Sequence, residues 1–181
     1  MKPADCNQRP GVHYRRSALL APLLAILAAC GGPDTVRSAA PNTPARAWPN
    51  VEPADPAKSN AVLMRAISLV GTPYRYGGNT PEGGFDCSGL VGYVFHDMLA
   101  LRLPRTTGEL AKLQGPRLRP DTLASGDLVF FGSNGTVSHV GIYVGEGRFV
   151  HAPSSGGTVR LDRLDGAWWK DHYSGARRLL F

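Results

Sequence analysis

Asp86-Cys87-Ser88-Gly89-Leu90-Val91-Gly92-Tyr93-Val94-Phe95 places a thiol at the predicted start of a helix. Aspartate is a favoured residue just before a helix, and the apolar residues that follow recur at the spacing of one helical face. We predict that this helix begins at Asp86 or Cys87 and that Pro104 ends it. A cysteine in that position lies at the positive end of the helix dipole, which favours the thiolate.

The rest of the domain divides into helices first and strands later. Two further helices are predicted over residues 55–71 and 106–113, each with a capping residue at its start, and residues 72–85 form a glycine-rich loop. After Pro120 the sequence changes to short β-favouring runs separated by Gly, Asn and Ser. These runs cover residues 127–131, 139–144, 148–152, 158–161 and 175–180. Helices followed by an antiparallel meander predict an α+β domain, which we place at residues 57–181.

Two histidines fall in neighbouring strands of this pattern. His139 begins one run, His151 lies near the end of the next, and a tight turn at residues 145–147 joins the two. Because side chains alternate along a strand, both imidazoles can face the same side of the sheet. If the first of these strands packs against the start of the cysteine helix, His139 can accept the proton of Cys87 and pass it to a leaving amine. The amide of Cys87 then points toward the oxyanion, and His151 fixes the tautomer of His139.

Each of these residues also has a simpler interpretation. A lone cysteine is usually a small buried hydrophobe, and Asp86 can be only a helix cap. One cysteine and two histidines also match the ligand types of a catalytic zinc site, but the sequence lacks a paired ligand motif. We therefore predict a thiol nucleophile and expect neither a metal nor a cofactor.

Residues 1–29 have the order of a bacterial signal peptide. Arg15-Arg16 precede an apolar stretch too short to span a bilayer, and Leu27-Ala28-Ala29-Cys30 resembles the lipobox of lipoproteins. That resemblance implies cleavage before Cys30 and acylation of this cysteine, which would anchor the chain in a membrane. The glycine after it favours the outer membrane, with the domain facing the periplasm. Residues 30–56 are rich in Pro, Ala, Asn and Thr without apolar periodicity, which predicts a disordered tether.

Charge and cysteine content restrict the remaining classes of function. The formal net charge is +6, and the basic residues are scattered rather than clustered, so we predict no nucleic-acid partner. The 3 cysteines fall in three different segments, and an odd count argues against a disulfide framework.

Six motifs, in a fixed order, carry a family resemblance. They are Gly71-Thr72-Pro73-Tyr74-Arg75-Tyr76-Gly77-Gly78, Phe85-Asp86-Cys87-Ser88-Gly89-Leu90-Val91, Leu103-Pro104-Arg105-Thr106-Thr107, Gly126-Asp127-Leu128-Val129-Phe130-Phe131, Ser138-His139-Val140-Gly141-Ile142-Tyr143 and Phe149-Val150-His151-Ala152. Through them the chain resembles the NlpC family of bacterial cell-wall cysteine peptidases over nearly all of residues 57–181. The resemblance implies a papain-like α+β fold with Cys87 as nucleophile, His139 as base and His151 as the third polar residue.

The same resemblance implies further site residues, a substrate and partners. Tyr74, or Tyr76 as a substitute, would line the site near the oxyanion, and Asp86 and Ser88 would recognise polar groups of the substrate. The expected substrate is the peptide of murein, cut either at a D-Ala–diaminopimelate cross-link, which we favour, or within a stem between D-Glu and diaminopimelate. The expected partners are peptidoglycan stem peptides, the membrane through Cys30, and a regulatory adaptor or protease; the protein is expected to be a monomer.

Two other functions stay open at the level of sequence. A non-catalytic envelope lipoprotein could use the same cleft to bind wall peptides or a partner hydrolase. An amidase or acyltransferase could use the same scaffold, although the order of cysteine before histidine disfavours the circularly permuted acyltransferases. Reactivity of Cys87 toward iodoacetamide near neutral pH separates the first of these from an enzyme.

Overall fold

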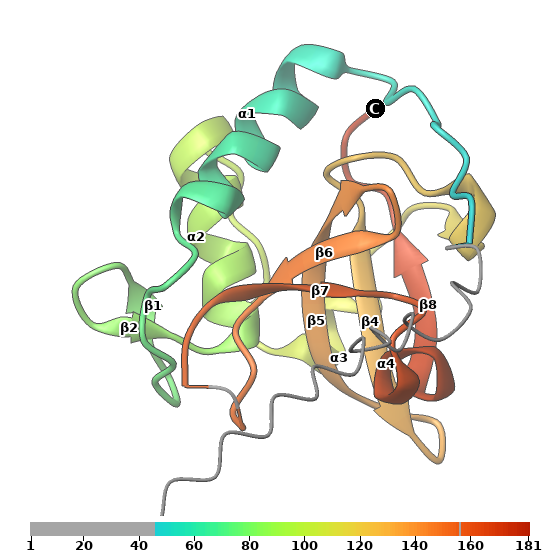
Figure 1. Ribbon diagram of the computed structural model, residues 1–181. Helices are drawn as coiled ribbons and strands as arrows, with labels where there is room; N and C mark the ends of the chain where they lie inside the picture. The colour runs from blue at the N-terminus through green and yellow to red at the C-terminus, as the bar shows by residue number, and fades with distance from the viewer. Residues whose placement is uncertain (1–45, 156) are drawn as a thin grey trace, which may run out of the picture. The chain divides into compact units, whose positions relative to one another are not determined.

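The two long helices cover one face of an antiparallel sheet, which confirms the predicted α+β class (Figure 1). The computed structural model describes residues 46–155 and 157–181. The predicted signal peptide, Cys30 and the first part of the predicted tether lie outside these residues. The sheet has the order β3-β8-β4-β5-β6-β7. Its strands are β3 (Arg117–Leu118), β4 (Leu128–Ser133), β5 (Thr136–Gly145), β6 (Arg148–His151), β7 (Arg160–Arg163) and β8 (Tyr173–Arg177).

The helix that carries the thiol is α2 (Cys87–Leu99). It begins at Cys87 because the Asp86 carboxylate accepts a hydrogen bond from a backbone N–H of the first turn at 2.7 Å. The prediction that Pro104 ends this helix is wrong. Ala100 adopts a left-handed φ of 53°, and its N–H bonds back to the last turn, so the helix closes before the proline is reached.

The other helices lie on both sides of α2 in the sequence. α1 (Pro56–Ser68) starts at the predicted cap, Asp55, whose carboxylate accepts from the Lys58 N–H at 3.0 Å. α3 (Thr107–Leu110) is shorter than predicted, although Thr106 caps it as expected. The 3₁₀ turn η1 (Pro120–Thr122) leads into the sheet.

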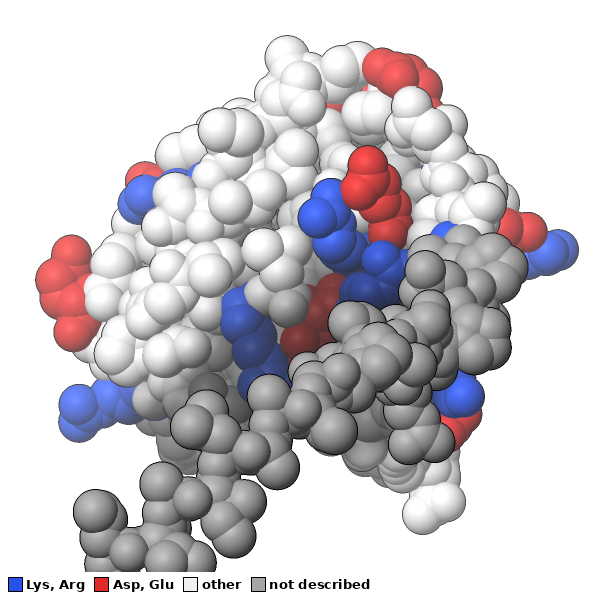
Figure 2. All heavy atoms as spheres, in the orientation of Figure 1, with Lys and Arg blue, Asp and Glu red and all other residues white. Residues whose placement is uncertain are grey.

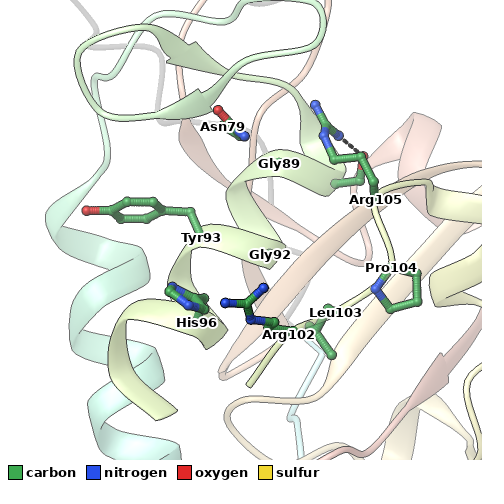
Figure 3. A pocket seen from close by; sticks show the side chains of 10 residues that line it. Asn79, Gly89, Gly92, Tyr93, His96, Arg102, Leu103, Pro104 and Arg105 are labelled. Atoms are coloured by element: carbon green, nitrogen blue, oxygen red, sulfur yellow. Dashed lines mark hydrogen bonds between the residues drawn. The ribbon is translucent and has the colours of Figure 1, made fainter. Parts of the chain in front are cut away.

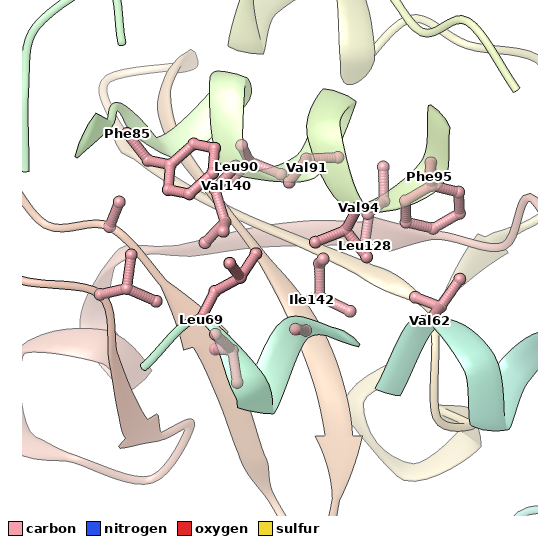
Figure 4. Close-up of a cluster of buried hydrophobic side chains, with 14 of the residues drawn as sticks. Val62, Leu69, Phe85, Leu90, Val91, Val94, Phe95, Leu128, Val140 and Ile142 are labelled. Atoms are coloured by element: carbon pink, nitrogen blue, oxygen red, sulfur yellow. The ribbon is translucent and has the colours of Figure 1, made fainter. Parts of the chain in front are cut away.

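The main core lies between α1, α2 and one face of the sheet (Figure 4). Fully buried apolar side chains meet there from both helices and from three neighbouring strands. They include Val62 and Ala66 of α1, Leu90, Val91, Val94 and Phe95 of α2, and Leu128, Val140, Ile142 and Val150 of the sheet. This packing presses α2 onto β5, the strand that carries His139.

The opposite face of the sheet carries an aromatic cluster, because side chains alternate along each strand. Phe131 of β4 packs there against Phe149 of β6, with ring centroids 4.9 Å apart. Trp169 of α4 (Ala167–His172) closes over both rings. We did not predict α4, because a six-residue helix is too short to show periodicity.

The chain order of the sheet differs from the predicted meander in one respect. Strands β4 to β7 pair in sequence, but β8 returns to pair with β4 and separates it from β3. The loop predicted at residues 72–85 also contains a short hairpin of β1 (Asn79–Thr80) and β2 (Gly84–Phe85). Strands of two residues carry too little pattern to be predicted from sequence.

Part of the predicted tether packs on the domain. Trp48 lies against the aromatic cluster, and Val51 forms a parallel bridge with Ala124. The Trp48 ring occupies the space that a side chain at position 147 would need, and Gly147 leaves that space open. Within the described residues, no helix has the length and apolarity needed to cross a bilayer.

Candidate active site

Cys87 lies where α2, α3 and β5 meet. Its side chain is half-buried and is a free thiol within residues 46–155 and 157–181. The sulfur lies 3.4 Å from the Thr107 hydroxyl, at the start of α3, and α3 in turn packs against β5. The thiol therefore sits at a helix N-terminus, where unpaired amides stabilise a negative charge, and this helix packs against the strand that carries His139.

The structure brings the two imidazoles into direct contact. Nε2 of His139 and Nδ1 of His151 are 2.8 Å apart, and both side chains lie on the sheet face opposite the main core. His139 is partly buried, whereas His151 is completely buried. The two nitrogens can share only one hydrogen, so one ring donates and the other accepts.

Asp162 on β7 decides which ring donates, and sequence reasoning missed this residue. Its Oδ2 lies 3.0 Å from Nε2 of His151, and an ionised carboxylate can only accept. His151 therefore carries its hydrogen on Nε2 and accepts at Nδ1 from the N–H of His139. The free lone pair of His139 is then on Nδ1. The same Asp162 oxygen also accepts from Arg160 at 3.0 Å and from Trp169 Nε1 at 3.0 Å.

Burial keeps both histidines neutral. Desolvation lowers the pKa of His139 to about 4, against a smaller raising effect of the Asp162 charge. Desolvation and the neighbouring His139 lower the pKa of His151 to about 3. The ring of Trp169 stands edge-on to His151 at a centroid distance of 4.7 Å and contributes to this burial. At neutral pH, His139 is thus an uncharged base.

Asp86 and Ser88 belong to an ion-pair network. Both Asp86 oxygens accept from the Arg105 guanidinium, at 2.9 and 2.7 Å, and Arg105 also donates to the Ser88 hydroxyl at 2.8 Å. Burial alone would raise the pKa of Asp86, but the hydrogen bonds from Arg105 and from the Gly89 amide outweigh it and hold this pKa below its usual range. Arg105 lies within a motif that we quoted, but nothing local in the sequence points to its pairing with Asp86.

The structure separates the two tyrosine candidates. Tyr74 is half-buried beside the core, and burial followed by the nearby Cys87 raises its pKa. Tyr76 is 90% exposed. Of the two, Tyr74 is the one whose hydroxyl feels the charge of Cys87, whereas Tyr76 lies in solvent near Arg105.

Two cavities adjoin these groups. One, of about 420 Å³, begins at Ser88 and Arg105 and runs along α2 past Tyr93; Figure 3 shows His96 and Arg102 beside it. The other, of about 480 Å³, has His139 in its wall. Cys87 itself lines neither cavity, but its neighbour Ser88 lines the first and His139 lines the second.

Comparison with known proteins assigns this arrangement to a family. Residues 71–178 match the NlpC/P60 family, and this span holds every site residue described above. The chain belongs to the NlpC/P60 family.

Relatives in this family include cell-wall enzymes of known name. The chain is 42% identical over 127 residues to the murein DD-endopeptidase MepH of Escherichia coli, which covers 68% of this chain and 47% of MepH. It is 45% identical over 111 residues to the probable endopeptidase NlpC of the same organism, covering 60% of this chain and 70% of the relative. The chain spans about half the length of MepH and of the probable endopeptidase YafL.

Solved NlpC/P60 structures share the fold. The NlpC/p60 domain of the peptidoglycan hydrolase SagA matches with a TM-score of 0.59 at 30% identity, covering 67% of this chain and 98% of that domain. The peptidoglycan hydrolase RipB of Mycobacterium tuberculosis matches with a TM-score of 0.59 at 31% identity, covering 69% of this chain and 66% of RipB. These likenesses agree with the papain-like α+β fold implied by the motifs.

Proposed function

We propose that this domain hydrolyses an amide bond in the peptides of peptidoglycan, with Cys87 as nucleophile. One observation carries the proposal: a half-exposed thiol at a helix N-terminus lies beside the strand of a neutral histidine that Asp162 holds, through His151, in one tautomer. The names of the NlpC/P60 relatives support the substrate class.

The proposed reaction runs through a thioester. Nδ1 of His139 accepts the proton of Cys87 as the sulfur attacks the carbonyl carbon. The amide of Cys87 and the hydroxyl of Tyr74 stabilise the oxyanion. The C–N bond breaks as His139 returns the proton to the leaving nitrogen. Water, deprotonated by His139, then hydrolyses the thioester and restores the thiol.

His151 and Asp162 act in this scheme as positioning residues. When His139 becomes an imidazolium, its Nε2–H still donates to His151, and His151 still donates to the carboxylate. The negative charge of Asp162 therefore stabilises the protonated state that forms during attack. Asp86 and Ser88 would meet polar groups of the acyl half, with Arg105 holding the Asp86 carboxylate in place.

Two bonds are candidates for cleavage, and we favour the D-Ala–diaminopimelate cross-link. The likeness to MepH, named a murein DD-endopeptidase, supports it. The bond between D-Glu and diaminopimelate is the second candidate. A 41% identity over 128 residues to the gamma-DL-glutamyl hydrolase of Bacillus subtilis supports that one.

The test is mass spectrometry of products from defined cross-linked and uncross-linked muropeptides. The wild-type protein should release shorter peptides, and Cys87→Ala and Cys87→Ser should release none. A thiol alkylator should stop the reaction and a chelator should not. Unchanged release by both variants would reject a thiol nucleophile.

We also propose that the domain works in the cell envelope as a lipoprotein. Acylated Cys30 would hold it at the outer membrane after removal of residues 1–29, facing the periplasm. A Cys30→Ala variant should then leave the membrane fraction; its continued fractionation with membranes would reject the anchor.

A further inference from the structure

The cavity on the His139 side is not used by the mechanism above. Its wall combines aromatic rings, hydroxyl groups and one formally charged side chain, Arg160. Building on the proposed function, we propose that this cavity binds the leaving half of the substrate, and that Arg160 there binds a free carboxylate next to the scissile nitrogen.

The position of the base assigns this cavity to the leaving half. His139 must deliver its proton to the leaving nitrogen, so that nitrogen has to lie against the His139 ring. His139 lines this cavity, whereas Ser88, the residue after the nucleophile, lines the other one. The leaving half therefore extends toward Arg160, and the acyl half toward Ser88 and Arg105.

Asp162 holds the Arg160 guanidinium in place and leaves one of its nitrogens free to donate to a ligand. Its Nε and Nη2 donate to Asp162 Oδ2 at 3.2 and 3.0 Å, which fixes the plane of the guanidinium. Its Nη1 donates to no atom of the described residues, and 42% of the side chain is exposed. A guanidinium with a free edge in a cleft is suited to a carboxylate. Arg148, Arg160 and Arg163 each pair with a carboxylate two residues away, and Figure 2 shows blue and red side chains side by side near the middle of this face.

The remaining wall suits an aliphatic chain. The ring of Trp168 is 49% exposed and stacks on His172 at a centroid distance of 3.9 Å and an angle of 7°. This stack holds the Trp168 ring as a flat apolar surface next to the charged Arg160. A carboxylate joined to a short methylene chain, as in diaminopimelate, matches a cation beside an aromatic surface.

This placement distinguishes the two candidate bonds. In a cross-link, the acylated nitrogen belongs to a diaminopimelate centre whose own carboxylate is free. In the bond from D-Glu within a tetrapeptide stem, the corresponding carboxyl group is already joined to D-Ala as an amide. Arg160 therefore selects the cross-link.

The experiment compares two synthetic cross-linked muropeptides with the full-length protein. They differ only in whether the carboxyl group beside the scissile nitrogen is free or converted to a carboxamide. Wild type should show a kcat/KM about tenfold or more higher for the free carboxylate, and Arg160→Gln should reduce this ratio to about one. Arg160→Lys should keep part of the preference. Arg163→Gln, on the outward side of the same strand, should keep all of it.

The ratio of the two kcat/KM values separates recognition of the carboxylate from the effect of Arg160 on the histidines through Asp162. Loss of the contact between Arg160 and Asp162 would slow both substrates equally and leave the ratio unchanged. If wild type cleaves both substrates and Arg160→Gln keeps the wild-type ratio, the carboxylate site is wrong while the proposed function stands. If wild type leaves the cross-link intact in both substrates but cuts between D-Glu and diaminopimelate, this inference is wrong while the proposed function stands. If wild type cuts no peptide bond in either substrate, the proposed function is wrong as well.

Discussion

Replacing Asp162 with asparagine tests the proposed chain of hydrogen bonds most directly. The oxygen at this position accepts from His151, Arg160 and Trp169. Four N–H groups from these three side chains converge on it, so an asparagine keeps its carbonyl oxygen there and preserves the tautomer of both histidines. The substitution therefore removes the charge and little else.

The size of the effect follows from the difference between two kinds of hydrogen bond. A hydrogen bond to a charged group contributes about 1.5–3 kcal/mol and a neutral one about 0.5–1.5 kcal/mol. The loss of about 1–2 kcal/mol of imidazolium stabilisation corresponds to a kcat/KM roughly 5–30-fold lower. The carboxylate raises the pKa of His139, so its loss makes this base weaker, and alkylation of Cys87 at pH 7.5 should slow as well.

The assay is kcat/KM from the release of a defined peptide, together with the rate of iodoacetamide alkylation. Asp165→Asn is the matched control. Asp165 pairs with Arg163, two residues earlier, in the same way that Asp162 pairs with Arg160. Among the described residues, Asp165 does not contact the histidines. Both variants should keep the unfolding midpoint of the wild type within a few degrees. Wild-type kcat/KM and thiol reactivity in Asp162→Asn, or equal losses in both variants, would refute the reasoning.

Three further predictions concern other parts of the domain. Tyr74→Phe should lower kcat about 100-fold by removing an oxyanion donor, while the exposed Tyr76→Phe should not; steady-state kinetics of both variants decides this. Trp48→Ala should lower the free energy of unfolding by about 2 kcal/mol in urea, whereas alanine at the exposed Phe181 should change it by less than about 0.5 kcal/mol. An equal loss in the two would contradict packing of Trp48. Folding lowers the pKa of His151 below its ordinary value of 6.5. As the pH falls below 6.5, His151 therefore binds a proton in the unfolded protein but not in the folded protein, which destabilises the folded state. This should remove on the order of 1 kcal/mol of stability between pH 7.5 and 5.5, and His151→Gln should abolish the contribution of His151 to this pH dependence.

Local signals in the sequence were enough to place the thiol and the two imidazoles. An aspartate before an apolar stripe fixes the start of α2, and alternation along two strands joined by a tight turn fixes the side that His139 and His151 face. Both rules act within a few residues, and the contact between the two rings follows from them.

The residues that sequence reasoning missed depend on pairing between distant segments. The strand predicted at residues 158–161 stops one residue short of Asp162, and its inward position appears only once β7 lies next to β6. The pairing of Arg105 was missed for the same reason, since helix α2 and the loop after it separate Arg105 from Asp86 in the sequence. A single Trp48 in a segment rich in proline and alanine gives no periodic signal.

Packing of Trp48 on the domain shortens the tether that would join the domain to a lipidated Cys30. An extended chain covers at most roughly 3.4 Å per residue, so a lipidated Cys30 can lie no more than about 60 Å from Trp48. If the tether extended to Pro56, the largest distance from Cys30 to the domain would be about 90 Å. If Cys30 is lipidated as proposed, the distance between membrane and wall limits which murein strands the domain can reach. Lengthening the segment before Trp48 would then extend this reach without altering the site.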